Sequence, residues 1–305
     1  MRGKSVGFLL LLFVFIFFSF QIWKLPAISI SQVPLQREID KSVLSFSSST
    51  RIHSRQAVLV SVSSKKVLFQ KRGEEKAYPA SLTKMMTAIL AIEHYNDLQK
   101  TVRIPAQLYN SLNQSGASMA GFLPNEKPKI IDLLYGTMLP SGADAAETLA
   151  LSVSGSENAF VSMMNRKAAE IGMKHTHFTN PSGLHDPNHY TTARDMSLLL
   201  LYALKNPVFH QIFTTHSYQI SPTNFHPNGM IVQSTLFQKM GNSSINGGAI
   251  IGGKTGYTDE AGLCLASLAQ IDGQTYNLIT LGAPGDHNTI QYDIEDAKLI
   301  YNQFE

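Results

Sequence analysis

Strand-like segments occur at both ends of the chain and helical patterns fill the middle, which restricts the folds that it can adopt. Near the start, two short apolar runs flank the polar turn Ser63-Ser64-Lys65-Lys66, a pattern typical of a β-hairpin. The middle, from about residue 88 to 215, shows mainly helical spacing. Apolar strand-like runs then return before a last helix. The segments outside the middle are strands at 57–62, 67–69, 250–256, 263–269 and 276–282, and a helix at 290–303. We therefore predict an α/β fold in which distant segments form one antiparallel sheet of about five strands, flanked by helices and carrying a helical subdomain.

Composition excludes several classes of protein. Hydrophobic residues make up 44% of the 305 residues and charged residues 15%, as in a globular domain. The net charge of +3, without any block of lysine and arginine, argues against nucleic-acid binding. Cys264 is the only cysteine, so neither an intrachain disulfide nor a cysteine-based zinc site can form. We expect Cys264 to be a buried strand thiol, and we expect no cofactor.

The N-terminus has the pattern of a membrane or export signal. Arg2 and Lys4 precede an uncharged, strongly apolar run that ends at Trp23-Lys24, a pair suited to the membrane interface. Ala27-Ile28-Ser29 is an acceptable cleavage site. Residues 1–29 are therefore predicted to be an uncleaved signal-anchor, which we favour, or a signal peptide. The polar, serine-rich residues 30–55 are predicted to be a spacer, and residues 56–305 the folded domain.

The segment after Pro79 supplies a nucleophile and a base. Ser81 and Lys84 are three residues apart at the start of a run with helical apolar spacing, so their side chains share one helix face. A serine attacks well only when a neighbouring group takes its proton, and a lysine can do so only when it is neutral. Burial and a second cation, for which Lys254 is the candidate, would favour neutral Lys84.

Two later segments strengthen this interpretation. Ser141-Gly142-Ala143 precedes a predicted helix, and Lys254-Thr255-Gly256 lies on a predicted strand. Glycine on a strand lets another backbone approach closely, and Lys254 and Thr255 can bind a carboxylate. Together with Ser81 and Lys84, they form a constellation suited to acyl transfer.

On these residues the chain resembles the serine-type D-alanyl-D-alanine carboxypeptidases, the low-molecular-mass penicillin-binding proteins. The resemblance runs from about Gln56 to Gly285. It implies a β-lactamase/transpeptidase-like fold and removal of the terminal D-alanine from peptidoglycan stem pentapeptides through an acyl-serine. Beyond the three motifs it rests on Gly116-Ala117-Ser118-Met119, Leu133-Leu134-Tyr135-Gly136, Ala193-Arg194-Asp195-Met196 and Lys254-Thr255-Gly256-Tyr257-Thr258-Asp259 with Ala261-Gly262.

The resemblance also implies roles for individual residues. Ser81 forms the acyl-enzyme, Lys84 accepts its proton, and Ser141 relays protons to the leaving D-alanine. Lys254 and Thr255 hold the terminal carboxylate, and Gly256 and Tyr257 also bind substrate. The backbone N–H groups of Ser81 and Tyr257 form the oxyanion hole. The implied partners are peptidoglycan stem peptides, β-lactams as covalent inhibitors, and the cytoplasmic membrane through the N-terminal segment. The implied location is the extracytoplasmic face of the bacterial cell membrane, or outside the cell if the segment is cleaved.

Two features depart from the family pattern. The second motif usually reads Ser-Gly-Asn, and Ala143 stands where the Asn is expected, so an amide that could bind substrate and steady Lys84 is missing. Many members also carry an additional β-rich domain and a C-terminal amphipathic anchor. The stretch after Gly256 is long enough for two strands and a helix only, which leaves the N-terminal segment as the expected anchor.

Three other functions remain open at this stage. A class A β-lactamase would need a deacylating Glu in a Glu-x-x-x-Asn setting, and Glu147, Glu157 and Glu170 all lack the Asn. A zinc peptidase is suggested by His175, His177, His185 and His189, although Pro187 argues against a shared helix face and no Glu follows His185. The third alternative is a non-catalytic or weakly active membrane-tethered protein that binds muropeptides or penicillin, with activity lost through Ala143.

Overall fold

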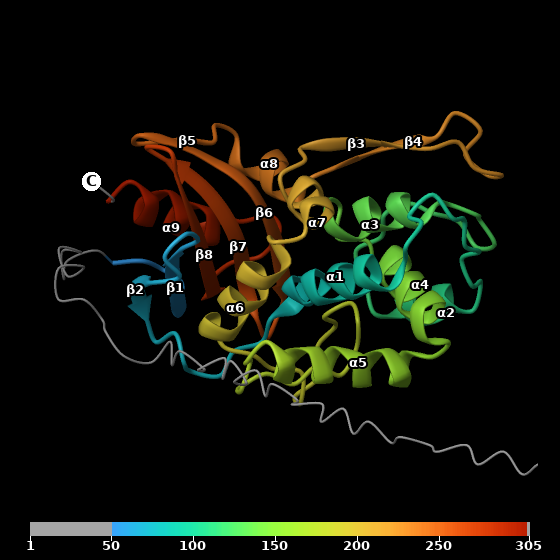
Figure 1. Ribbon diagram of the computed structural model, residues 1–305, viewed down its shortest axis with the longest axis horizontal. Coiled ribbons are helices and arrows are strands. Elements are labelled where there is room, and N and C mark those ends of the chain that lie inside the picture. The colour runs from blue at the N-terminus through green and yellow to red at the C-terminus, as the bar shows by residue number, and fades with distance from the viewer. Residues whose placement is uncertain (1–50, 304–305) are drawn as a thin grey trace, which may run out of the picture. The chain divides into compact units, whose positions relative to one another are not determined.

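Six strands form one antiparallel sheet in the computed structural model, which describes residues 51–303 (Figure 1). The strand order is β2-β1-β8-β7-β6-β5, so the first strand of the domain pairs with the last one. The strands are β1 (Gln56–Ser61), β2 (Val67–Lys71), β5 (Ser244–Ile245), β6 (Gly248–Thr258), β7 (Gly262–Ile271) and β8 (Gln274–Ala283). The prediction of one sheet built from distant segments is confirmed.

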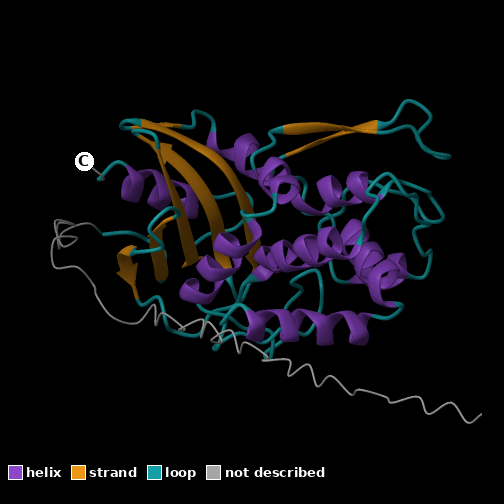
Figure 2. Cartoon of the chain, in the orientation of Figure 1, coloured by secondary structure: helices purple, strands orange, loops and turns teal. Residues whose placement is uncertain are grey.

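Helices cover both faces of this sheet (Figure 2). Side chains alternate along β1: Leu59 packs in a cluster with Ile294 and Ile300 of α9, whereas Val58 and Val60 join the larger core shared with the central helices. The flanking elements are the 3₁₀ turn η2 (Ala80–Thr83), α1 (Lys84–His94), α6 (Ala193–Ala203), α7 (Pro207–Phe213), α8 (Thr235–Met240) and α9 (Tyr292–Tyr301).

The remaining helices form the predicted helical subdomain around α1. Residues 84–92 of α1 are all buried, because the helix contacts helices of the subdomain on one side and α6 on another. The Lys84 side chain at the start of α1 is therefore almost fully shielded from bulk water. The subdomain consists of α2 (Leu108–Gln114), α3 (Ile130–Met138), α4 (Ala143–Ser154) and α5 (Glu157–Glu170).

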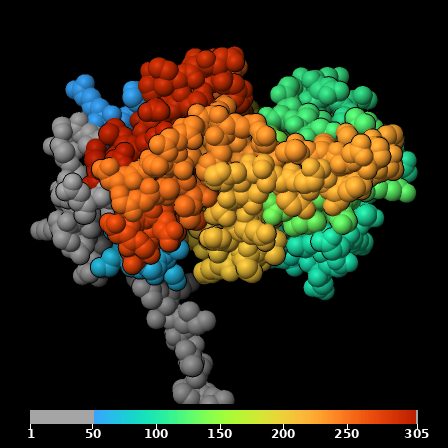
Figure 3. Space-filling model, turned by 90° about the horizontal axis from the view of Figure 1, so that it is seen from above, coloured from blue at the N-terminus to red at the C-terminus, as the bar shows by residue number. Residues whose placement is uncertain are grey.

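Two short elements were not anticipated. The sheet has a sixth strand, β5, which is only two residues long. A separate hairpin, β3 (Ser217–Ile220) and β4 (Met230–Gln233), extends over the green helical part of the molecule (Figure 3). Each strand of this hairpin has four residues, and Ile231 is exposed, so neither strand has the long apolar run by which strands are recognised in a sequence.

The packed domain begins earlier than the predicted boundary at Gln56. Ile52 and Ser54, which the sequence analysis assigned to the spacer, are buried. The carboxylate of Asp296 on α9 accepts hydrogen bonds from the backbone N–H groups of His53 and Ser54 and from the Ser54 hydroxyl. This buried carboxylate fixes residues 53–54 against α9, so the packed part of the chain includes residues that were predicted to belong to the spacer.

The predicted signal segment 1–29 and most of the spacer lie outside the described residues. Within residues 51–303, none of the helices combines the length and the apolar character that membrane crossing requires.

Asp296→Ala should lower the free energy of unfolding by about 3 kcal/mol, because it leaves buried backbone donors without an acceptor. Chemical denaturation of the purified protein measures this loss. Glu295→Ala is the matched control, since Glu295 is exposed on the same helix, and its effect should stay within about 0.5 kcal/mol. Equal effects of the two substitutions would show that Asp296 does not fix the chain entry.

Candidate active site

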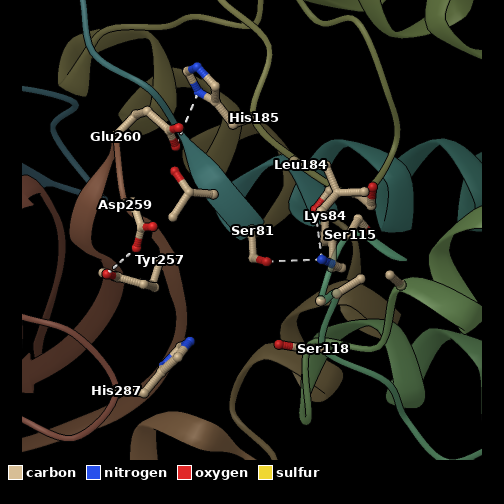
Figure 4. Close-up of a pocket in the computed structure, with 16 residues that line it drawn as sticks. Ser81, Lys84, Ser115, Ser118, Leu184, His185, Tyr257, Asp259, Glu260 and His287 are labelled. Atoms are coloured by element: carbon tan, nitrogen blue, oxygen red, sulfur yellow. Dashed lines mark hydrogen bonds and ion pairs between the residues drawn. The ribbon is translucent and has the colours of Figure 1, made fainter. Parts of the chain in front are cut away.

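Ser81 and Lys84 meet at the junction between the 3₁₀ turn η2 and helix α1. The Nζ of Lys84 donates a hydrogen bond to the Oγ of Ser81 at 2.9 Å, as Figure 4 shows. Ser81 lies in the 3₁₀ turn just before α1. The preceding Ala80 has φ +46°, a left-handed conformation that is costly for a residue with a side chain. The predicted pairing of serine and lysine is present, on a strained turn.

Lys84 is 2% exposed and its ammonium has few polar neighbours. Besides Ser81, Nζ donates to the backbone carbonyl of Ser182 at 2.6 Å. Burial lowers the pKa of Lys84 to about 8, although the negative charges of Glu147 and Asp144 act in the opposite direction. Since the ordinary value is about 10.4, a far larger fraction of Lys84 is neutral near physiological pH than of an exposed lysine. Lys84 is thus able to accept the Ser81 proton.

The loop that holds Lys84 was not found by sequence reasoning. Asn180 caps it by accepting hydrogen bonds from the backbone N–H groups of Ser182 and Gly183. Gly183 has φ +81°, and a Cβ at this position would lie 1.9 Å from the carbonyl oxygen of Ala80. Only glycine permits this approach to the Ser81 turn. Asn180-Pro181-Ser182-Gly183 is a recognisable turn sequence, but nothing in it indicates contact with Lys84.

Ser141 lies in the connection between α3 and α4, with φ +66°. Its side-chain oxygen is buried and has no hydrogen-bond partner within the described residues. The connection is fixed by Ala143, whose N–H donates to the carbonyl of Ser118 at 2.7 Å. The carboxylate of Asp144 accepts from the N–H groups of residues 120–122, which holds this segment beside the site.

Strand β6 forms the opposite wall. A Cβ at Gly256 would lie 3.0 Å from the backbone nitrogen of Ser81, so glycine permits the close approach of strand and turn. Lys254 is 1% exposed, and its Nζ donates to the carbonyl of Thr255 at 2.7 Å. Burial, assisted by the charges of Lys84 and Lys239, holds the pKa of Lys254 well below its usual value.

Two cavities meet at Ser81. The first, about 390 Å³ in volume, contains Ser81, Lys84 and Ala143 and opens toward the ion pair between His185 and Glu260 (Figure 4). The second, about 300 Å³, contains Ser81, Ser141, Thr255 and Gly256. Ser81, Ser118, Tyr257 and His287 line both cavities. The predicted residues therefore converge on one place, and a substrate bound across the junction would extend into both cavities.

Lys254 is the exception among the predicted site residues. It does not line either cavity, because its side chain is enclosed in the wall that Thr255 and Gly256 present to the second one.

The histidines that suggested a metal are distributed differently. His189 is buried, and its Nδ1 accepts the backbone N–H of Thr179, so its Nε2–H donates to the hydroxyl of Thr83 at 2.8 Å. Burial lowers the pKa of His189 to about 4, which keeps the ring neutral. Within residues 51–303 the side chains of His, Cys, Asp and Glu form no cluster of three or more suited to a metal ion. Cys264 is buried on β7, as predicted.

Relatives of known sequence match most of the chain. D-alanyl-D-alanine carboxypeptidase DacF of Bacillus subtilis is 30% identical over 254 residues, which are 83% of this chain and 63% of the relative. D-alanyl-D-alanine carboxypeptidase DacB2 of Mycobacterium tuberculosis is 34% identical, over 68% of this chain and 69% of the relative. The chain thus spans less than two thirds of the Bacillus relative.

The fold has close counterparts among solved structures. The crystal structure of the Streptomyces K15 DD-transpeptidase superposes with a TM-score of 0.74 at 27% sequence identity, covering 84% of this chain and 98% of that one. A D-alanyl-D-alanine carboxypeptidase from Mycobacterium tuberculosis gives a TM-score of 0.70. These matches confirm the predicted transpeptidase-like fold. The family model for D-alanyl-D-alanine carboxypeptidase (peptidase family S11) matches residues 44–285, and the chain belongs to this family.

Proposed function

We propose that the protein is a serine D-alanyl-D-alanine carboxypeptidase that removes the terminal D-alanine from peptidoglycan stem pentapeptides. The observation that carries the proposal is the 2.9 Å hydrogen bond between Ser81 Oγ and a buried Lys84 whose pKa lies near 8, at the junction of two cavities. Family membership supports the same reaction class. The alternative of a non-catalytic or weakly active protein that binds muropeptides or penicillin rests on Ala143.

In the acylation step, neutral Lys84 takes the hydroxyl proton of Ser81 while Oγ bonds to the carbonyl carbon of the penultimate D-alanine. The backbone N–H groups of Ser81, in the 3₁₀ turn η2, and of Tyr257, on strand β6, would stabilise the oxyanion. The Ser81 N–H lies in the first turn of a helical segment, where N–H groups lack partners within the helix. The C–N bond to the terminal D-alanine then breaks. Its nitrogen receives a proton from Lys84 through Ser141, whose buried hydroxyl has no other partner among residues 51–303.

Deacylation regenerates the enzyme with water as the second substrate. The water oxygen bonds to the acyl carbon, and its proton passes to neutral Lys84. The Ser81 Oγ leaves and recovers a proton from the Lys84 ammonium, which keeps its bond to the Ser182 carbonyl throughout. A β-lactam would acylate Ser81 in the same way and remain attached where water reaches the ester slowly, which would make this protein a penicillin target.

We propose the extracytoplasmic face of the bacterial membrane as the location, since peptidoglycan is found there. The apolar segment that follows Arg2 and Lys4 supports export, with residues 1–29 as an anchor or, if cleaved, as a signal peptide.

Ser81→Ala should abolish D-alanine release from a peptide ending in D-Ala-D-Ala, because no other group can form the acyl-enzyme. Release is measured as free D-alanine, beside covalent labelling with a fluorescent penicillin. Ser111→Ala is the control, since Ser111 is an exposed serine outside both cavities. Absence of release from folded wild-type protein would favour the muropeptide-binding alternative, and undiminished labelling of Ser81→Ala would exclude Ser81 as nucleophile.

The acylation rate should rise with pH through a midpoint near 8, because only neutral Lys84 accepts the serine proton. The Glu147 carboxylate raises the pKa of Lys84, so Glu147→Gln should move the midpoint below 8. Stopped-flow acylation by penicillin over a range of pH measures the shift. Glu170→Gln, on the exposed end of α5, should leave the midpoint in place. A midpoint that does not move in Glu147→Gln would mean that Glu147 does not act on Lys84.

Ala143→Asn should increase the acylation rate by about 2- to 10-fold, the effect of one added hydrogen bond. Ala143 lines the first cavity together with Ser81 and Lys84, so an amide at this position can reach substrate. Ala143→Leu, which adds similar bulk without an amide, is the control and should not accelerate acylation. An unchanged or lower rate in Ala143→Asn would indicate a site organised around alanine.

A further inference from the structure

The second cavity contains a cation that the proposed mechanism does not use. Lys239 on α8 lines this cavity together with Ser81, Ser141 and Thr255. Its side chain is partly buried, and within residues 51–303 it forms no ion pair with a carboxylate. No sequence motif marks it. Because this amine beside the nucleophile is not directly paired with a carboxylate, it can bind an anionic ligand in the cavity.

The bonds of Lys239 leave one donor available. Its Nζ donates to the side-chain oxygen of Gln291 at 2.9 Å and lies 3.3 Å from the Nδ1 of His287. Both partners are uncharged acceptors when the imidazole is neutral, and the lowered pKa of His287, caused by burial and by Lys239, favours that state. An ammonium has three N–H donors, so one remains for a third acceptor.

A second donor comes from two threonines on the same cavity wall. The hydroxyls of Thr235 and Thr255 are 2.6 Å apart, so one donates to the other. Two hydroxyls have two protons, and their mutual bond uses only one of them. The other can be donated to a group in the cavity, which therefore offers an ammonium and a hydroxyl to one anion.

Lys254 is poorly placed to act as this cation. It is almost fully buried, is absent from the cavity lining, and gives one of its donors to the carbonyl of Thr255. Its lowered pKa also disfavours the charged form. Lys254 thus holds the backbone of Thr255 from within the wall, whereas Lys239 lines the second cavity.

The other titratable groups around Lys239 belong to the segment 286–293. Asp293 lines the same cavity with one buried oxygen that has no partner among residues 51–303, and burial raises its pKa to about 6. Burial lowers the pKa of Lys239 from its ordinary value, and the charges of Asp293 and Asp286 oppose this effect.

We infer that Lys239, with the hydroxyl of Thr255, binds the free C-terminal carboxylate of the substrate and restricts the enzyme to removing the last residue of a chain. This inference rests on the proposed function and adds a specificity-determining residue to it. A peptide that continues beyond the scissile bond presents an amide in place of the carboxylate, and an amide cannot form the charge-assisted bond to the ammonium. The site should therefore favour carboxypeptidase over endopeptidase activity.

The test compares one peptide ending in D-Ala-D-Ala as the free acid and as the C-terminal amide. For the wild type, kcat/KM should be about 10- to 100-fold higher for the acid, the range of one lost charge-assisted hydrogen bond. Lys239→Met keeps the length of the side chain and removes the charge. Its kcat/KM for the acid should therefore fall toward the value for the amide, which should change little. Lys239→Arg should retain most of it. Lys174→Met, an exposed lysine outside both cavities, should behave as the wild type.

The acid-to-amide ratio is measured within each protein, so partial loss of folded enzyme does not affect it. A readout independent of peptide hydrolysis is the rate of Ser81 acylation by benzylpenicillin relative to its methyl ester, which should show the same loss of preference in Lys239→Met. If the wild type is active and Lys239→Met keeps the wild-type preference with both pairs of compounds, the inference is overturned. If the wild type releases no D-alanine and is not acylated, it is the proposed function that fails.

Discussion

Burial of the Lys84 ammonium is the constraint on which the rest of the site depends. An exposed lysine stays protonated near neutral pH and cannot accept a proton from serine. Here α1 lies at the centre of the domain, in contact with the helical subdomain and with α6, and Lys84 at its start is only 2% exposed. The cost of desolvating the amine is limited by the carbonyl of Ser182 and by the charges of Glu147 and Asp144. The packing of α1 thus lowers the pKa of Lys84.

The site is assembled from segments that are distant in the sequence, and two of these segments contain a residue with a strained backbone. The left-handed conformations of Ala80 and Ser141 occur at the nucleophile turn and at the connection between α3 and α4, which face each other near the cavities. Such conformations persist only where the surroundings enforce them. For Ala80 the enforcement comes from Gly183 and Gly256, which bring a loop and a strand into contact with the turn. The sheet order, with its first and last strands paired, makes this convergence possible.

The sequence predicted those parts that have a local pattern. Long apolar strands, the helix after Pro79 and the pairing of Ser81 with Lys84 could be recognised because their spacing reflects local geometry. The motifs at Ser141 and Lys254 could be recognised through the resemblance to the family. The role of Ser182 could not, since its contribution is a backbone carbonyl that any residue carries. Lys239 could not be recognised from the sequence either, because its proposed role depends on a cavity that other segments form. The packing of residues just before Gln56 could not be recognised, because they are bound by a carboxylate more than two hundred positions away in the sequence.

Helix α4 offers a physical reason why Ala143 need not abolish activity. Asp144 and Glu147 are both buried on this helix and lie three residues apart, hence on one face. Both charges raise the pKa of Lys84 against the effect of burial, so they moderate the shift that burial alone would produce. Asp144 also fixes the segment at 120–122 through its backbone N–H groups. Because Glu147 lies outside both cavity linings, it can act on Lys84 without occupying the space that substrate needs. In this chain two buried carboxyl groups of α4 therefore act on the charge of Lys84 in the absence of an amide at position 143.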